Sequence, residues 1–569
     1  MTVTPPALSV ADAADSANIA RYLPRMAAER PNQVAVVAGD GRDRAGKGIY
    51  RRLSFAELDQ ASDRYAWGLA GVGIGRGVRV LLLVPAGLPL ISLTFALFKV
   101  GAVPIMIDPA MGRRNLAQCI EECAPDAMIG IPAAHLARQI FRRAFRTVRR
   151  SVLVGSRYLP LGDVNLEALS LPLRTPFPAE RVAADDLAAI LFTTGSTGVP
   201  KGVLYEYGMF DSQIRQLYQL YQIAPGEVEM PAFPLFALFN VALGVTSAIP
   251  PIDPTRPAAC DPAAVIAFMQ DQQVTSTFGS PAIWEKVTAY AVERGVTLPH
   301  LRRVLMAGAP VPPHIHTRFR HILAPAADTH TPYGATEALP IASASGREVL
   351  AALAERDDPT AGTCIGRPAP EVTLRIIGIS DEPIATWDDS LCLPPYAVGE
   401  ICVKGPSVTK AYVNRPHSTA QAKIHEGSVI WHRMGDLGYL DAQGRLWFYG
   451  RKTHRVETAS GPLYTEPVEL LFNQHPAVFR SALVGLAQAA GGGRQAVEPV
   501  VLVELKKGLA PKTAHEHERL LAELRELGAA HPMTAGIARF MIHPAFPVDI
   551  RHNAKIFREQ LAVWAEGHL

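Results

Sequence analysis

Residues 190–208 read ILFTTGSTGVPKGVLYEYG and combine an apolar run with glycines, hydroxyls and one lysine. The hydroxyl donors in this stretch are Thr193, Thr194, Ser196 and Thr197. Gly195 and Gly198 let successive backbone N–H groups turn toward an anion, and Lys201 adds a mobile positive charge. A P-loop requires Ser or Thr after its lysine, and Gly202 stands there instead. The stretch therefore predicts another kind of phosphate-binding loop, or a plain turn between a strand and a helix.

Segments on both sides of this loop alternate between apolar strands and helical stretches. Residues 33–110 include VRVLLLVP, LISLTFALFKVGAV and PIMIDP, and two further apolar runs follow at 126–131 and 151–155. DDLAAILF at 185–192 begins a second series of strands and helices that continues to about residue 340. The alternation predicts parallel sheets covered by helices, which is the α/β class.

One stretch is long enough to raise the question of a membrane span. The nineteen residues between Arg79 and Lys99 carry no charge, which is close to the length that crosses a bilayer. Pro85, Gly87 and Pro89 interrupt this stretch, so we expect a buried strand followed by a helix. The first residues lack a basic start followed by an apolar core, so we expect no secretory signal and no transmembrane segment.

The pattern changes in the second half of the chain. Residues 363–447 hold short strands separated by Gly and Pro, which predicts a smaller β-rich subdomain. Strands and a charged helix then alternate again and predict a separate α+β region. We expect a large amino-terminal domain over 1–449, a hinge at 450–453 and a small mobile domain over 454–569.

Composition and charge argue against several classes of function. Hydrophobic residues make up 48% of the 569 residues and charged residues 19%, and the formal net charge is +3. Because Lys and Arg are scattered among acidic residues, we expect neither a nucleic-acid partner nor binding to an anionic membrane surface. The six cysteines lack metal-ligand spacing, so we expect reduced thiols and a cytoplasmic location.

The stretch TTGSTGVPKG resembles the phosphate loop of the adenylate-forming superfamily, which includes acyl-CoA synthetases, luciferases and nonribosomal-peptide adenylation domains. Further elements resemble that family in the expected order over nearly the whole chain. They are AGAP at 307–310, YGATE at 333–337, GDLGYLDAQGRLWFYGR at 435–451 and NAKIFR at 553–558. The resemblance implies parallel-sheet αβα subdomains and a small β-rich subdomain, followed by a mobile α+β domain with the catalytic lysine.

The resemblance also implies ATP and Mg²⁺ as cofactors and gives roles to individual residues. Lys555 would bridge the α-phosphate of ATP and the substrate carboxylate, and Lys201 would be a further catalytic residue that adds a mobile positive charge to the phosphate loop. Glu337 and Thr197 would hold Mg²⁺, and Asp436 would accept hydrogen bonds from both ribose hydroxyls. The other nucleotide-binding candidates are Thr193, Thr194, Gly195, Ser196, Gly198, Gly308, Ala309, Pro310, Tyr333, Gly334, Thr336 and Arg451. Such a set suits transfer to the α-phosphorus, which needs dispersed positive charge more than an acid–base pair.

The expected acyl pocket departs from the family pattern. Acyl-CoA synthetases often carry a histidine where this sequence has Ala237, and Phe233, Phe236 and Phe239 lie close to it. These residues predict a wide apolar pocket wall in a strand region, or ordinary strand core.

The hinge and the last motif depart as well. Thr453 and His454 replace a common Lys-Asp or Asp-Asp pair, and Glu457 replaces a lysine. A negative charge there would not help to bind the phosphorylated end of coenzyme A. The last motif keeps Lys555, with Ala554 where a glycine normally precedes the lysine. Adenylation is therefore expected, and transfer to a thiol is disfavoured.

A hydroxyl on the substrate itself could replace the thiol. A 3-hydroxyl can attack the activated carbonyl within the same bound molecule and gains from proximity. The hinge region THRVETASGPLYTEP resembles the β-lactone-forming branch of the superfamily, which acts in bacterial long-chain olefin biosynthesis. That resemblance implies conversion of a long-chain 2-alkyl-3-hydroxy acid to a cis-β-lactone, AMP and pyrophosphate. It also implies the pathway's reductase and β-lactone decarboxylase as candidate partners.

Two other functions stay open on the sequence alone. One is a long-chain fatty acyl-CoA or acyl-carrier ligase, which would share the phosphate loop. The other is a nucleotide-binding regulator without turnover, and the intact set of Lys201, Glu337, Asp436 and Lys555 argues against it. His330 and His454 lie near the expected site, and the sequence assigns neither of them as the base for the 3-hydroxyl.

Overall fold

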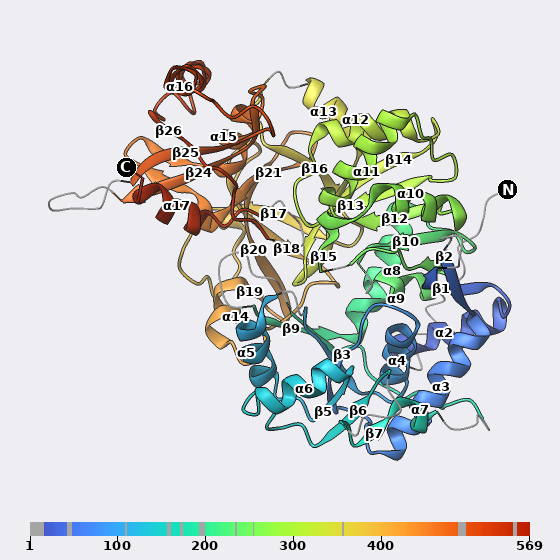
Figure 1. The fold of residues 1–569 in the computed structure, drawn as a ribbon. Helices are drawn as coiled ribbons and strands as arrows, with labels where there is room; N and C mark the ends of the chain where they lie inside the picture. The colour runs from blue at the N-terminus through green and yellow to red at the C-terminus, as the bar shows by residue number, and fades with distance from the viewer. Residues whose placement is uncertain are drawn as a thin grey trace.

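The computed structural model of the protein describes residues 16–42, 48–108, 111–155, 161–170, 175–192, 200–233, 236–253, 255–355, 358–487, 497–549 and 555–568. Its elements form two large sheets with helices and a smaller carboxyl-terminal region of α+β structure (Figure 1). Within these ranges, no helix is long and apolar enough to cross a membrane. The predicted α/β class, with a large sheet-rich part followed by a small one, is confirmed.

The first sheet has seven strands in the order β7-β6-β5-β3-β4-β8-β9, and all neighbours are parallel except β8 and β9. Its strands are β3 (Arg79–Leu83), β4 (Val103–Met106), β5 (Ala127–Gly130), β6 (Arg150–Leu153), β7 (Val164–Asn165), β8 (Leu187–Phe192) and β9 (Gly202–Glu206). The helices along this part of the chain are α3 (Phe55–Gly71), α4 (Leu88–Lys99), α5 (Arg113–Cys123), α6 (Pro132–Ile140) and α7 (Leu166–Leu169). The uncharged stretch after Arg79 thus divides into β3 and α4, as predicted.

Polar contacts at their ends fix α3 and α4. α3 begins with a capping box, in which Ser54 Oγ accepts from the backbone N–H of Glu57 and the Glu57 carboxylate accepts from the Ser54 N–H. Lys99, at the end of α4, is 2% exposed and donates to Asp59 Oδ1 (2.6 Å) and to Asp63. Because a buried ammonium group is stable only with such partners, these bonds hold α4 against α3.

The two strands that flank residues 193–199 form an antiparallel hairpin. β8 and β9 pair from Leu187 opposite Glu206 to Phe192 opposite Gly202. The prediction of a strand-to-helix turn is therefore wrong, and α8 (Tyr207–Tyr221) follows only after β9. DDLAAILF also begins no second series, because β8 pairs with β4 in the first sheet.

The second sheet is mixed and runs β17-β18-β20-β21-β16-β15-β14-β13-β12-β10-β11-β1-β2, with β19 paired to β20. Its strands are β1 (Val34–Arg42), β2 (Gly48–Ser54), β10 (Val228–Pro231), β11 (Thr246–Ala248), β12 (Ser276–Gly279), β13 (Arg303–Met306), β14 (Asp328–Ala335), β15 (Ala338–Ser345), β16 (Thr363–Pro368), β17 (Thr373–Ile377), β18 (Gly399–Lys404), β19 (Lys423–Glu426), β20 (Val429–Leu440) and β21 (Leu446–Arg451). The helices on this part of the chain are α2 (Tyr22–Glu29), α8, α9 (Ala237–Ala242), α10 (Pro262–Asp271), α11 (Pro281–Arg294), α12 (Pro313–Ile322), α13 (Gly346–Glu355) and α14 (Pro416–Ala422).

Two features of this sheet differ from the sequence-based expectation. β1 and β2 form a hairpin whose first strand pairs with β11, so they are not part of the first parallel sheet. The β-rich segment 363–447 continues the second sheet through the pairing of β15 with β16. The strand β11 that pairs with β1 lies about 200 residues away in the sequence, where a local pattern cannot identify it.

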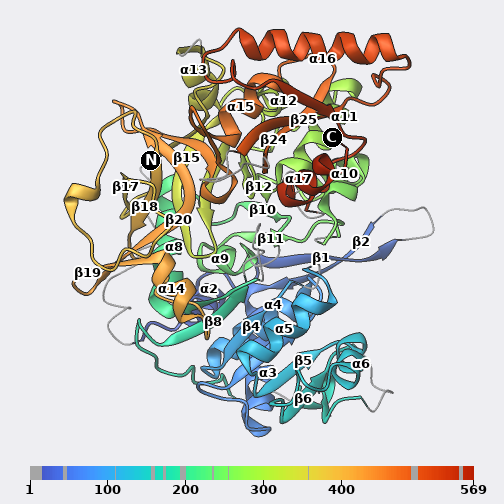
Figure 2. The same cartoon turned by 90° about the vertical axis from the view of Figure 1, so that its left-hand side faces the viewer.

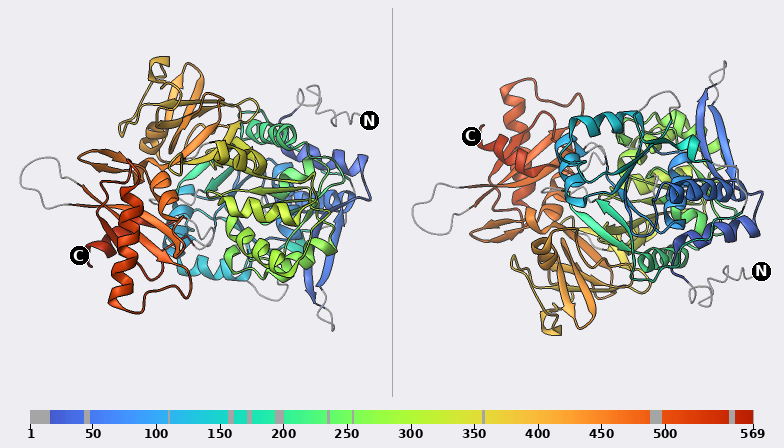
Figure 3. Two further views of the ribbon diagram at one scale, coloured as in Figure 1. Left: turned by 90° about the horizontal axis from the view of Figure 1, so that it is seen from above. Right: turned by 90° about the horizontal axis from the view of Figure 1, so that it is seen from below.

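The carboxyl-terminal region begins after β21 with a short 3₁₀ turn, η6 (Lys452–His454). Its elements are β22 (Val456–Thr458), β23 (Gly461–Leu463), α15 (Thr465–Phe472), β24 (Val478–Ala487), β25 (Val497–Leu505), α16 (Ala514–Ala529), β26 (Arg539–Ile542) and α17 (Arg558–Glu566). β24, β25 and β26 form a separate sheet, with α16 on its outer side (Figures 2 and 3). The expected hinge falls where the chain leaves the second sheet, and its mobility stays a prediction.

Candidate active site

One cavity of about 1040 Å³ is lined by residues of the second sheet, α8 and the carboxyl-terminal region. Among the described candidate residues, all except Ala237 line it. These are Lys201, Phe233, Phe236, Phe239, Gly308, Ala309, Pro310, Tyr333, Gly334, Thr336, Glu337, Asp436, Arg451 and Lys555. The candidates Thr193, Thr194, Gly195, Ser196, Thr197 and Gly198 lie outside the described residues. Motifs that are separated widely in the sequence thus meet at one place.

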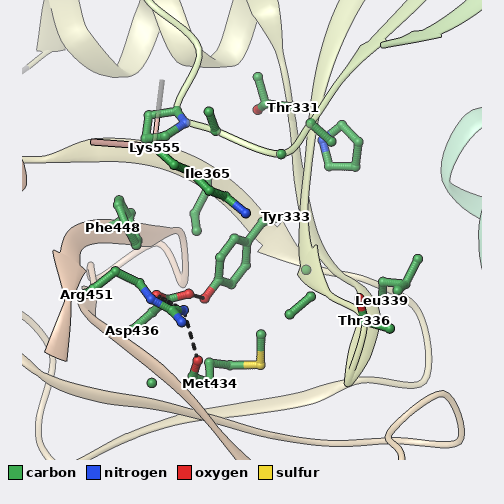
Figure 4. Close-up of a pocket in the computed structure, with 18 of the residues that line it drawn as sticks. Thr331, Tyr333, Thr336, Leu339, Ile365, Met434, Asp436, Phe448, Arg451 and Lys555 are labelled. Atoms are coloured by element: carbon green, nitrogen blue, oxygen red, sulfur yellow. Dashed lines mark hydrogen bonds and ion pairs between the residues drawn. The ribbon is translucent and has the colours of Figure 1, made fainter. Parts of the chain in front are cut away.

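Tyr333, Asp436 and Arg451 form a hydrogen-bonded cluster in this cavity (Figure 4). The Tyr333 hydroxyl donates to Asp436 Oδ2 (2.6 Å), and Arg451 Nη1 donates to Asp436 Oδ1 (2.7 Å) and to the Met434 carbonyl (3.3 Å). Asp436 and Arg451 are directly paired residues of β20 and β21, which brings their side chains to the same face. Burial raises the pKa of Tyr333, and the Asp436 charge raises it further. The cluster holds a carboxylate in a fixed orientation.

Two glycines let the main chain line the cavity closely. Gly308 follows β13 with φ at 95°, a conformation that suits glycine. A Cβ added at Gly334 would lie 2.8 Å from the Ala338 carbonyl oxygen, so a side chain there would clash. Backbone groups of the AGAP and YGATE segments are therefore part of the cavity wall.

Glu337 lies beside Tyr412 and Lys201. The Tyr412 hydroxyl donates to Glu337 Oε1 (2.8 Å), and the Lys201 ammonium lies 5.0 Å from the centre of the Tyr412 ring. Burial lowers the pKa of Lys201, and the Glu337 charge opposes this shift. Across the described residues, no group of three or more His, Cys, Asp or Glu side chains could hold a metal ion alone. An oriented carboxylate beside a lysine suits a Mg²⁺ that keeps phosphate and water ligands.

The buried Lys423 holds the main chain of Glu337 in place through Thr409. Lys423 on β19 is 1% exposed and donates to the carbonyl and to the hydroxyl (3.3 Å) of Thr409. The N–H and the hydroxyl of Thr409 both donate to the Glu337 carbonyl, each at 2.9 Å. Burial lowers the pKa of Lys423 to about 7. These bonds fix the main chain at Glu337.

Lys555 reaches the cavity from the carboxyl-terminal region. Figure 4 shows its side chain extending to the same side of the cavity as Tyr333 and Ile365. Its carbonyl accepts a hydrogen bond from the Asp549 N–H (2.9 Å), which holds the main chain next to Val548 and Ile556. The second sheet and the carboxyl-terminal region therefore both contribute to the site.

The apolar wall of the cavity is aromatic. Phe236 stacks on Phe278 of β12 with ring centres 3.8 Å apart, and it contacts Phe233 and Phe239 at 6.0 and 5.7 Å. The expected strand is in fact the helix α9, which Ala237 begins. Ala237 is fully buried in the core and is absent from the described lining, because the helix turns successive side chains to different faces.

Buried ionisable groups lie where the cavity is lined by the carboxyl-terminal region. Thr363 donates to Glu466 (2.5 Å), and Arg558 donates to both carboxylate oxygens of Glu469 (2.8 and 2.7 Å). Burial raises the pKa of Glu466 to about 7. Burial, with two nearby arginines, lowers the pKa of His454 to about 3, so its imidazole is neutral. Within the described part of the chain, neither His454 nitrogen has a hydrogen-bond partner.

The other residues noted at the hinge and near YGATE lie elsewhere. Glu457 on β22 pairs with Arg455 at 2.6 Å and its side chain is 59% exposed. His330 on β14 contacts the Tyr221 ring with ring centres 5.3 Å apart. Neither Glu457 nor His330 is among the described lining residues.

The sequence motifs do not mark several residues that line or support the cavity. Four of these residues form hydrogen bonds with residues at least 14 positions away, so no local pattern identifies them. They are Tyr412, Lys423, Gln213 and Glu466. Arg558 carries a weak signal, because it lies three residues after Lys555 in the last motif.

Comparison with known proteins gives the family. The profile described as AMP-binding enzyme matches residues 23–413. The chain is 50% identical over 555 residues to an olefin beta-lactone synthetase of Xanthomonas campestris pv. campestris, covering 96% of this chain and 97% of the relative. It is 48% identical over 561 residues to an olefin beta-lactone synthetase of Stenotrophomonas maltophilia, covering 97% and 98%.

A solved structure shows the same fold. The o-succinylbenzoate coenzyme A synthetase of Bacillus subtilis, in complex with ATP and magnesium ion, superposes with a TM-score of 0.72 at 22% identity, over 95% of this chain and 98% of that one. With the profile match over more than half of the sequence and the two relatives over nearly all of it, the chain belongs to the AMP-binding enzyme family.

Proposed function

We propose that the protein is an ATP-dependent, AMP-forming β-lactone synthetase. Its substrate would be a long-chain 2-alkyl-3-hydroxy acid, and its products a cis-β-lactone, AMP and pyrophosphate. The observation that carries this proposal is the identity of about half of the residues with two olefin beta-lactone synthetases over nearly their full length. The cavity supports it, because it combines an oriented carboxylate cluster, two lysines and an aromatic wall.

In the first step, a carboxylate oxygen of the acid attacks the α-phosphorus of ATP. The bond from that phosphorus to its bridging oxygen breaks, and pyrophosphate leaves. Lys555 would hold the two anions together, and Lys201 would hold the departing phosphates, because fixed cations stabilise charge that spreads over phosphate oxygens. Asp436 would accept the ribose hydroxyls, with Tyr333 beside the adenine.

The residues present fit a Mg²⁺ ion. Glu337 supplies a hard oxygen ligand, and its orientation is set by Tyr412 and by the Thr409 bonds to its main chain. A Mg²⁺ ion bound there would neutralise charge on the phosphates. Glu337 would therefore hold Mg²⁺, and Thr197 remains a second candidate ligand.

In the second step, the 3-hydroxyl oxygen attacks the activated carbonyl carbon of the same molecule. The bond from that carbon to the phosphate oxygen breaks, AMP leaves with the electron pair, and the hydroxyl proton is released. This closure needs no second substrate, because the nucleophile is already held within reach. Because ring closure needs no coenzyme A, this chain can carry Glu457 where coenzyme A ligases usually carry a lysine.

The proposal includes a place in a pathway. A β-lactone that carries two alkyl groups is an apolar product, and loss of carbon dioxide from it gives an olefin. A ketone-reducing enzyme must supply the 3-hydroxy acid, and a decarboxylase must consume the lactone, so both are candidate partners. The expected cytoplasmic location is part of the proposal, in keeping with six cysteines that are free thiols.

One incubation tests the proposal. The protein is mixed with ATP, Mg²⁺ and a 2-alkyl-3-hydroxy acid without coenzyme A, and the products are identified by mass spectrometry. We expect lactone and AMP in equal amounts. Strict dependence on coenzyme A, with an acyl thioester as product, would instead identify an acyl-CoA ligase. ATP binding without pyrophosphate release for any acid would identify a regulator.

A further inference from the structure

Gln213 on α8 is a buried polar residue of the cavity to which the proposed reaction steps give no role. Gln213 lines the cavity and is 1% exposed. Its Nε2 donates to the Leu339 carbonyl (3.1 Å), whereas its Oε1 is buried and has no hydrogen-bond partner among the described residues. A buried acceptor without a donor is unfavourable, so a ligand that supplies the donor would be favoured at this position.

The orientation of the Gln213 amide is fixed by its neighbours. The Tyr205 hydroxyl donates to the Thr336 carbonyl (2.6 Å), so the phenol oxygen can only accept from Gln213. Burial raises the pKa of Tyr205, and a hydrogen bond from Gln213 opposes this shift. Because Leu339 and Tyr205 both require a donor, Nε2 must face them, and Oε1 must be the acceptor that remains.

The face of α8 that lines the cavity changes character along the helix. Gln213, Leu217 and Tyr221 all line it, and they follow one another at intervals of four residues. Tyr221 donates its hydroxyl to Ser343 Oγ (3.0 Å), so that polar atom is satisfied within the protein. Among the described α8 residues that line the cavity, Gln213 therefore carries the polar atom without a hydrogen-bond partner, and Leu217 follows about 6 Å along the axis.

Gln213 also lies at the right end of the cavity for the reacting group. Its partner Leu339 lies two residues after Glu337, the proposed Mg²⁺ ligand, and Thr336, which accepts from the neighbouring Tyr205, directly precedes Glu337. In a 3-hydroxy acid, the hydroxyl oxygen is separated from the carboxyl carbon by only two carbons. A group that recognises this hydroxyl must therefore lie next to the site of adenylation, and the apolar chains must lie beyond it.

We propose that Oε1 of Gln213 accepts a hydrogen bond from the 3-hydroxyl of the substrate and selects 3-hydroxy acids over acids that lack this group. The inference rests on the proposed function and names the residue that gives it substrate specificity. A neutral amide cannot take up the hydroxyl proton, so Gln213 is a positioning residue. It orients the oxygen toward the carbonyl carbon.

A neighbouring glutamine provides a matched control. Gln216 is 0% exposed, its Nε2 donates to the Pro370 carbonyl (2.8 Å), and its Oε1 is also without a hydrogen-bond partner among the described residues. Gln216 is not among the described residues that line the cavity. Replacing either glutamine by Met removes the same groups from the same helix, and only the change at Gln213 alters the cavity.

The experiment compares two acids on three proteins. Pyrophosphate release is measured for a 2-alkyl-3-hydroxy acid and for the same acid without the hydroxyl, using wild type, Gln213→Met and Gln216→Met. We expect wild type to prefer the hydroxy acid in kcat/KM by about 5- to 150-fold, the range for a buried acceptor left without its donor. The preference should fall close to one in Gln213→Met and persist in Gln216→Met.

The outcomes separate this inference from the proposed function. A wild-type protein that forms lactone but accepts both acids equally in the adenylation step would overturn the role of Gln213 and leave the function standing. The same holds if Gln213→Met folds and keeps the wild-type preference. If wild type released no pyrophosphate with the hydroxy acid, both would be refuted. Gln213→Leu is measured in the same way, so that the role of Gln213 can be decided if Gln213→Met does not fold.

Discussion

The hydrogen bond from Tyr412 to Glu337 offers the sharpest test of the proposed metal and phosphate site. Tyr412→Phe removes one hydroxyl that donates to a carboxylate oxygen at 2.8 Å and leaves the ring beside Lys201 in place. Tyr412 is 7% exposed, so water replaces the lost donor poorly. A hydrogen bond to a charged group contributes about 1.5–3 kcal/mol, which corresponds to about 10- to 150-fold in an equilibrium constant.

The assay follows pyrophosphate release against Mg²⁺ concentration at saturating ATP and hydroxy acid. We expect the Mg²⁺ concentration for half-maximal rate to rise by about tenfold or more in Tyr412→Phe, because Glu337 loses its orientation. Tyr439→Phe is the control, since its buried hydroxyl donates to the Ala361 carbonyl (2.9 Å) and does not line the described cavity. An unchanged Mg²⁺ dependence in folded Tyr412→Phe would refute the assignment of Glu337.

Three further predictions concern nucleotide binding, the buried Glu466 carboxyl and the Arg558–Glu469 pair. Lys555→Ala should abolish pyrophosphate release yet weaken ATP binding less than Asp436→Ala does, and equal large losses in calorimetry would contradict these roles. Burial raises the pKa of Glu466 from an ordinary 4.5 to about 7, so its contribution to the free energy of unfolding is fully present below pH 4.5 and is lost as the pH rises through 7. In urea unfolding, Glu466→Gln should therefore be more stable than wild type at pH 8 and similar to wild type at pH 4.5. Arg558→Met should lower the free energy of unfolding by about 3–5 kcal/mol because it leaves the Glu469 carboxylate buried without its partner, and a loss below about 1 kcal/mol would show that the pair is dispensable.

The sequence predicts the elements of this fold better than their pairing. Apolar runs such as 79–83 and 103–106 form strands where expected, because burial on both faces leaves a continuous hydrophobic pattern. The same local pattern cannot show that 187–192 returns to the first sheet or that 34–42 joins the second. Strand pairing depends on contacts between distant residues, and a period of two residues carries no information about the partner.

The residues of the candidate site were also predictable from the sequence only in part. The motifs around Lys201, Glu337, Asp436 and Lys555 predict residues that the structure places in one cavity. Their supporting residues are invisible in the sequence, because a buried tyrosine such as Tyr412 looks like any core aromatic until its partner is known. Ala237 was misplaced for a related reason: a short apolar run does not distinguish a strand from a helix, and the two turn its side chain to different sides.

The Asp436 cluster has a consequence for the choice of nucleotide. Each oxygen of this carboxylate already accepts a bond from the protein, one from Tyr333 and one from Arg451. If the bound sugar lacks its 2′-hydroxyl, each Asp436 oxygen therefore still has a hydrogen-bond donor, which is the Arg451 guanidinium or the Tyr333 phenol. We expect this enzyme to accept 2′-deoxy-ATP as a substrate, with only a small preference for ATP in kcat/KM.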